Sequence, residues 1–153
     1  MPAASAPKVD FYVLAGSESR ARLKFACRLA EQAYLDQQRV FVWLDDAAEL
    51  QSFDELLWTF ADRSFVPHEI FSDPAQWHET PVLLGWQLQP QQPYDLLLNL
   101  GSEVPAAAAH AARIAEIVDA EEPRRRAGRN RFRHYRNQGL APDTHTVTAE
   151  VTL

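Results

Sequence analysis

The sequence predicts a single α/β domain with a mostly parallel central sheet and helices on both faces. Short β-branched and aromatic runs, at 9–14 and 40–44, alternate with longer segments of helical periodicity. This β-α-β-α order favours a parallel sheet, because the helices cross back over its faces. A length of 153 residues suits one domain with a real core.

The first strand and helix are the clearest elements. Residues 9–14 form a buried strand, and residues 15–17 form a turn in which Ser17 or Ser19 can cap the helix that follows. The helix is expected over about 20–37, because its apolar residues keep helical spacing. Cys27 lies on that apolar stripe, so it is expected to be a packing residue.

A second strand and helix come next. Residues 40–44 read as a strand that ends at Asp45 and Asp46, which we interpret as caps of a helix reaching about Phe60. The inward face of this helix is expected to carry Phe53, Leu57 and Phe60, which are spaced i, i+4 and i+7.

The remaining elements are less regular. We expect irregular chain over 58–70, a loop over 74–80, strands at 81–86 and 94–100, an alanine-rich helix at 104–113, and a last central strand at 114–118. Residues 1–8 are expected to be a flexible leader, 9–140 the domain and 141–153 a tail. The alternating Thr and Val of that tail leave an edge strand and disorder both open, and no role is assigned to it.

Composition limits the functional classes. The chain has one cysteine, no apolar run of membrane-spanning length and no signal-peptide pattern at its N-terminus, which favours a cytoplasmic protein that does not contact a membrane. A pI near 5.3 disfavours a general nucleic-acid binder.

Motifs for catalysis and cofactor binding are missing. The first turn, AGSESR, is neither GxxxxGK[ST] nor GxGxxG, so the phosphate cradle of nucleotide-binding folds is not present. The five histidines are scattered, and no GxSxG elbow or pair of acidic residues stands out. We therefore expect no catalytic residue, no bound metal and no cofactor.

Positive charge is concentrated in one segment. Seven arginines fall between Arg124 and Arg136, although the chain carries −6 overall and −13 without them. The segment reads as a helix, with Pro123 in its first turn and Gly139 at its C-terminal end. On this helix Arg125, Arg129 and Arg133 repeat every four residues, with Phe132 beside them. Such a stripe suits a ligand with acidic groups and an apolar end; a solvated basic face is the simpler alternative.

Aromatic residues gather in a second segment, 54–70. Trp58 lies off the inward face of its helix and Phe65 lies in a loop. Exposed aromatic side chains are typical anchors of protein interfaces. Burial of both rings is the competing interpretation.

The chain resembles the χ subunit family of bacterial DNA polymerase III over about residues 9–140. The resemblance rests on FYVL, VFVWLDD, DELLW followed by SFVPH, DLLLNL and the closing RFRHYRNQG. It implies a nucleotide-binding type of α/β fold without its phosphate loop, and a non-catalytic subunit of the polymerase holoenzyme.

The resemblance also implies partners and sites. Family members bind the ψ subunit, which joins them to the clamp loader, and the acidic C-terminal tail of single-stranded-DNA-binding protein, so contact with DNA is indirect. Matched by position, the tail site comprises Val118, Arg125, Arg129, Phe132 and Arg133. The ψ site comprises Trp58 and Phe65, and a repair helicase could share that surface. Phe132 stands where the family often has tyrosine.

Two other functions remain open at this point. The arginines could bind single-stranded nucleic acid directly, with Phe132 or Tyr135 stacking on bases. Alternatively, Asp45 and Asp46 could belong to a degenerate NTPase-like domain.

Overall fold

A computed structural model describes residues 6–147 of the protein. Its elements are β1 (Lys8–Leu14), α1 (Ser19–Leu35), β2 (Val40–Trp43), α2 (Ala47–Thr59), β3 (His68–Ile70), η1 (Pro74–His78), β4 (Val82–Gly85), β5 (Tyr94–Asn99), η2 (Ala106–His110), β6 (Ala111–Val118), α3 (Glu122–Asn137) and β7 (Asp143–Val147), where η marks a short 3₁₀ helix.

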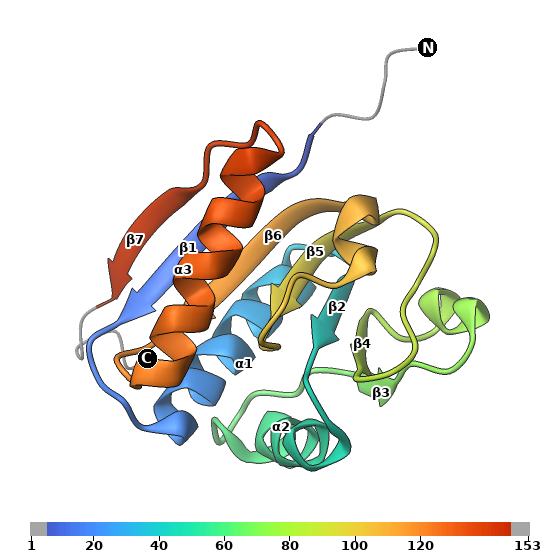
Figure 1. The fold of residues 1–153 in the computed structure, drawn as a ribbon. Helices are drawn as coiled ribbons and strands as arrows, with labels where there is room; N and C mark the ends of the chain where they lie inside the picture. Colours follow the sequence, from blue (N-terminus) through green and yellow to red (C-terminus); the bar gives the residue numbers. More distant parts are fainter. Residues whose placement is uncertain (1–5, 148–153) are drawn as a thin grey trace.

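The strands form one sheet of seven strands in the order β3-β4-β2-β5-β6-β1-β7. Every neighbouring pair is parallel. Figure 1 shows β7 and β3 at opposite edges of this sheet. The expected α/β class with a parallel sheet is therefore confirmed.

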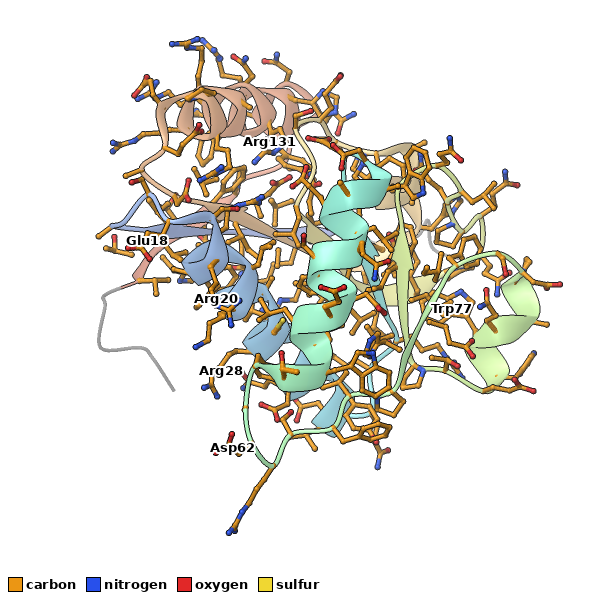
Figure 2. The ribbon with its side chains drawn as sticks, turned by 90° about the horizontal axis from the view of Figure 1, so that it is seen from below. Glu18, Arg20, Arg28, Asp62, Trp77 and Arg131 are labelled. Carbon is orange, nitrogen blue, oxygen red and sulfur yellow. The ribbon has the colours of Figure 1, made fainter. Side chains whose placement is uncertain are left out.

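Helices cover both faces of the sheet, as the sequence predicts. The crossovers through α1 and α2 run toward the β3 edge, whereas the crossover through α3 runs from β6 to β7. Because such crossovers are right-handed, opposite directions place the helices on opposite faces. Figure 2 shows α3 on one side of the sheet and α1 with α2 on the other.

Two apolar cores lie on these faces. The core under α1 and α2 includes Phe53, Leu57, Phe60 and Cys27, which are all buried as expected. The core on the α3 face combines aromatic residues, among them Phe11, Phe41 and Tyr135, with aliphatic residues of the strands such as Leu97 and Ile114. None of the helices within residues 6–147 combines the length and the apolar composition that crossing a bilayer requires.

The segment expected as a helix over 104–113 is folded differently. Only the 3₁₀ helix η2 forms there, and β6 already begins at Ala111. Alanine favours helix, but β6 lies between β1 and β5, and pairing with two strands outweighs that local preference.

Smaller differences concern caps and edges. Neither Ser17 nor Ser19 caps α1; its N-cap is Glu18, without a side-chain hydrogen bond. Short β3 and η1 occupy segments expected to be irregular or loop. Of the two possibilities for the chain after Leu140, residues 143–147 form an edge strand, β7, while residues 148–153 lie outside the described part.

Candidate peptide-binding surfaces

The arginine segment forms α3, and its four inward residues fix it against the sheet. These residues, spaced i, i+4, i+7 and i+11, are Arg124, Gly128, Arg131 and Tyr135. A Cβ atom on Gly128 would lie 2.9 Å from Cγ2 of Val118 in β6. The helix therefore approaches the sheet so closely at this point that only glycine fits.

A buried polar network anchors the C-terminal half of α3. The carboxylate of Glu116 in β6 is fully buried and accepts hydrogen bonds from three side chains. Nε of Arg131 donates at 2.7 Å, the hydroxyl of Tyr135 at 2.6 Å and Nδ2 of Asn99 at 2.9 Å. Burial, together with the negative charge of Glu116, raises the pKa of Tyr135. Arg131 is thus a structural cation rather than a ligand-binding one.

Arg124 anchors the other end of α3. Its guanidinium bonds both oxygens of Asp119, a residue that is only 1% exposed, with the shorter contact at 2.7 Å. It also donates to the backbone oxygen of Ser17 at 3.2 Å. The hydrogen bonds that Arg124 donates to Asp119 raise the pKa of Arg124.

The arginines that remain open to solvent form an adjacent stripe. Arg125, Arg129 and Arg136 are exposed and form no ion pair within residues 6–147, so their charge is free for a ligand. Two further exposed arginines have local partners: Arg133 donates to Asn130, and Arg126 lies 4.0 Å from Glu122.

Phe132 lies in that stripe on the side facing β1. Its ring is half-buried and packs against Phe11, with ring centroids 5.1 Å apart. An apolar ring therefore stands beside Arg125, Arg129 and Arg136 at the boundary between α3 and the sheet. We call these four residues, with Arg133, the arginine surface. The neighbouring Val118 is buried under Gly128.

The second surface lies where α2 ends and β3 begins. Trp58 is 51% exposed and Phe65 is 61% exposed, and their ring centroids are 5.7 Å apart. Burial of both rings, the competing interpretation, is therefore wrong. We call this pair the aromatic surface.

His68 supports the aromatic surface from below, a role that the sequence did not suggest. Its buried ring lies 4.5 Å from the ring of Trp58. Nδ1 bonds the backbone oxygen of Val66 at 2.6 Å, and Nε2 lies 3.1 Å from a carboxylate oxygen of Asp54. Asp54 precedes Trp58 by one helical turn, so α2 and β3 together fix the indole.

Comparison with known proteins decides the family. The family model for the DNA polymerase III chi subunit, HolC, matches residues 7–143. The chain is 39% identical to the DNA polymerase III subunit chi of Pseudomonas aeruginosa over 140 residues, which cover 92% of this chain and 96% of that protein. It is also 27% identical to the Haemophilus influenzae subunit, over 93% of this chain and 99% of that one. This chain belongs to the DNA polymerase III chi subunit family.

Solved structures show the same fold at low sequence identity. T4 UvsW superimposes with a TM-score of 0.67 over 94% of this chain and 42% of its own, at 10% identity. A DEAD box protein from Methanococcus jannaschii gives 0.58 over 92% of this chain and 42% of its own, also at 10% identity. These likenesses concern the fold alone.

Ligands of parallel α/β sheets usually bind beyond the carboxyl ends of the strands. In this chi family member ion pairs occupy part of that edge. Arg22 is buried, lies 3.5 Å from Glu49, and leaves its Nε without a partner. Burial lowers the pKa of Arg22 and raises that of Glu49. The Arg124–Asp119 pair lies beside them.

The aspartates after β2 have structural roles. Asp46 caps α2, as expected, by accepting a hydrogen bond from the backbone N–H of Glu49 at 2.8 Å. Asp45 instead accepts one from the backbone N–H of Ser102 at 2.8 Å, which joins the loops after β2 and β5. The described residues contain no cluster of three or more potential metal ligands.

Proposed function

We propose that the protein is a non-catalytic adaptor of DNA polymerase III. Its arginine surface binds the acidic C-terminal tail of single-stranded-DNA-binding protein, and its aromatic surface binds the ψ subunit, which links it to the clamp loader. The observation that carries this proposal is the division of α3 into two stripes. One stripe neutralises buried acids, and the other leaves Arg125, Arg129 and Arg136 without ion-pair partners in the described chain, beside the half-buried ring of Phe132.

The ligand's chemistry fits the arginine surface. By the family resemblance, the tail ends in aspartates, a proline and a terminal phenylalanine, so it brings carboxylates and one apolar ring. Guanidinium forks bind carboxylates in bidentate geometry, and the edge of Phe132 offers an apolar contact for a phenyl group. Partly exposed ion pairs contribute about 0.5–1 kcal/mol each and burial of a phenyl ring about 2 kcal/mol. Four such arginines and one phenyl contact together contribute about 4–6 kcal/mol, which corresponds to a weak affinity between about 40 μM and 1 mM.

Val118 and Arg133 complete the proposed tail site in different ways. Val118 is buried, so its contribution is to set the depth at which Gly128 and α3 lie on the sheet. Arg133 is exposed next to Phe132 and needs only to exchange its contact with Asn130 for a carboxylate.

The aromatic surface is proposed for ψ because its two rings are exposed yet fixed in place. The ring of Trp58 packs in tilted geometry against both Phe65 and His68, so little side-chain freedom is lost when a partner covers it. Tryptophan held in this way is a typical centre of binding energy. A repair helicase could compete for the same surface.

Calorimetry with a synthetic tail peptide tests the proposal. Arg129→Ala is expected to weaken binding about twofold to fivefold, because it removes a charge that no other group of the described protein uses. Arg126→Ala is the matched control, since this exposed arginine of the same helix lies near Glu122. Equal loss in the two variants would show that only net charge matters. Unchanged binding in Arg129→Ala, or tight binding of bare single-stranded DNA, would contradict the assignment.

A further inference from the structure

Charge is divided between two parts of the sequence. Residues 40–112 contain eleven acidic residues and a single basic one, Arg63, which gives a formal charge of −10. The rest of the chain contains fourteen basic and ten acidic residues, a charge of +4. The arginine surface and the aromatic surface therefore belong to segments of opposite charge.

Because of the strand order, the acidic and basic segments also occupy different parts of the sheet. Residues 40–112 supply the four adjacent strands β3, β4, β2 and β5, together with α2. Strands β6, β1 and β7 form the other part of the sheet, which α3 covers. As Figure 1 shows, α2 and β3 lie at one side of the molecule and α3 with β7 at the other. The protein is thus electrically bipolar along the width of its sheet.

The immediate surroundings of the aromatic surface are acidic as well. Asp54 contacts His68, the residue that packs against Trp58. Glu55, the next residue of α2, is exposed. Glu69 of edge strand β3 does not belong to these surroundings, because its side chain points to the opposite face of the sheet from His68 and Ile70 and accepts a hydrogen bond from Nε2 of Gln76 at 3.1 Å. Asp62 stands in the turn that follows α2, as labelled in Figure 2.

Two basic residues and one further apolar side chain complete these surroundings. Arg63 follows Asp62 in the turn, and Arg28 of α1 lies over the ring of Phe60, 5.6 Å from its centroid. Phe60 points into the core, so Arg28 stands on the α1 side of α2. Ile70 is 51% exposed and extends the apolar area along β3.

We propose that the aromatic surface binds a partner segment that carries lysine or arginine side chains beside its apolar residues. This proposal rests on the use of that surface for docking, proposed above, and adds the chemistry of the occupant. Trp58, Phe65 and Ile70 supply apolar contact, while Asp54 and Glu55 select positive charge at the rim. The same acids repel an acidic tail, so the two partners cannot exchange surfaces.

Two labelled amphipathic peptides test this inference. They have the same length and the same leucine and tryptophan residues, and differ in carrying either lysine or glutamate at every other position. Binding to the full-length protein is measured by fluorescence anisotropy. We expect the lysine peptide to bind, the glutamate peptide to bind at least tenfold more weakly, and an excess of the acidic tail peptide not to displace the lysine peptide.

Substitutions locate the binding. Trp58→Ala is expected to abolish binding of the lysine peptide, and Glu55→Lys, one helical turn before Trp58, to weaken it about fivefold. Glu103→Lys is the control: it makes the same charge change on an exposed residue of the acidic segment, but in the loop after the carboxyl end of β5. An equal effect of Glu55→Lys and Glu103→Lys would overturn the local charge selection.

Two other outcomes would also overturn the inference. Equal binding of both peptides, sensitive to Trp58→Ala, would leave the docking surface in place and refute its preference for basic segments. Binding of the lysine peptide that survives Trp58→Ala would place it elsewhere on the acidic segment. Neither outcome affects the tail-peptide test at Arg129, so failure of this inference is distinguishable from failure of the adaptor function.

Discussion

Nε of Arg131 donates a 2.7 Å hydrogen bond to the carboxylate of Glu116, and both side chains are almost fully buried. This buried contact distinguishes Arg131 from the exposed arginines of the same helix. It neutralises an acid within the apolar run of residues 114–118 in β6, and in doing so fixes the helix that presents the other arginines.

Arg131→Met is expected to destabilise the protein by about 3–5 kcal/mol, because it leaves the charge of Glu116 buried without a cation. Arg129→Ala, on the same helix, is expected to change stability by less than about 0.5 kcal/mol. Urea denaturation followed by circular dichroism measures both values. Similar losses in the two variants would contradict the distinction between anchoring and binding arginines.

Tyr135→Phe removes one of the three donors to Glu116. Since a hydrogen bond to a charged group is worth more than one between neutral groups, we expect a loss of about 1.5–3 kcal/mol. Tyr94→Phe is a matched control, because the hydroxyl of this buried tyrosine donates to the neutral backbone oxygen of Ala107 at 2.9 Å, and its loss should cost about 0.5–1.5 kcal/mol. The reverse order, measured in urea, would contradict the role of the buried carboxylate.

Stability is expected to fall steeply in alkaline solution. Burial raises the pKa of Cys27 from its ordinary value of 9.0 to about 12, and burial also raises the pKa values of Tyr94 and Tyr135. The unfolded chain releases these protons at lower pH than the folded protein does. The free energy of unfolding is therefore highest below pH 9 and falls above it, by up to about 1.4 kcal/mol per pH unit for each group.

Cys27→Ala checks the contribution of the thiol. The slope of stability against pH between 9 and 10, measured by urea titrations, should become flatter in the variant, whereas the tyrosines should keep their effect above pH 10. An identical slope in both proteins would show that the Cys27 thiolate forms in the folded state. Slow reaction of Cys27 with a thiol reagent at neutral pH should accompany the burial.

The stability of edge strand β7 against local opening is expected to depend on His145. Its Nε2 lies 2.8 Å from Oδ1 of Asp10, and its ring stacks on Tyr12 at 5.0 Å. His145→Ala removes both contacts from an edge strand whose other four residues are exposed or half-buried. Amide hydrogen exchange over 143–147 should accelerate about tenfold if these contacts contribute about 1.4 kcal/mol.

Lys8→Ala is the control for β7. It removes an exposed ion pair between Lys8 and Asp143, which should contribute little. Greater acceleration of exchange in Lys8→Ala than in His145→Ala would contradict the prediction.

The loss of stability at acidic pH should also change in His145→Ala. Burial opposes ionisation of Asp10, but the hydrogen bond from His145 and the charges of Lys8 and Arg113 outweigh it and hold the pKa of Asp10 below its ordinary value. The stabilisation from this carboxylate is fully present above pH 3.8 and is lost as the pH falls through the folded-state pKa. His145→Ala should therefore make acid unfolding begin at higher pH, as followed by circular dichroism.

The sequence predicted the elements whose pattern is set locally. The apolar runs of β1, β2, β4 and β5 are clear in the sequence because these strands are buried in the sheet, and the apolar periodicity of α1 and α2 is clear because one face of each helix is buried. Helix α3 was predicted from its arginine spacing, with Pro123 in its first turn and Gly139 after its end. The strand at 114–118 was also predicted correctly, as part of β6, but the helix over 104–113 was wrong, because the start of β6 lies between two strands of the sheet and requires extended chain there.

The anchoring roles of Arg124 and Arg131 could not be predicted from the arginine run itself. Asp119 and Glu116 meet these arginines only after α3 folds back over β6. One signal was available: Glu116 interrupts the apolar run from Ile114 to Val118, and a buried acid requires a cation or donors. Exposure of Trp58 agreed with its position off the inward face of α2, whereas the support from His68 depends on tertiary contacts.

The close approach of Gly128 to Val118 has a consequence for how the binding specificity of α3 can change. Gly128 and the network around Glu116 set how closely α3 approaches the sheet. The outward arginines therefore do not determine the position of the helix. They can be exchanged for lysine, or reversed to glutamate, while the backbone of α3 keeps its place. Engineering could therefore retune this helix for a new peptide without redesigning the scaffold beneath it.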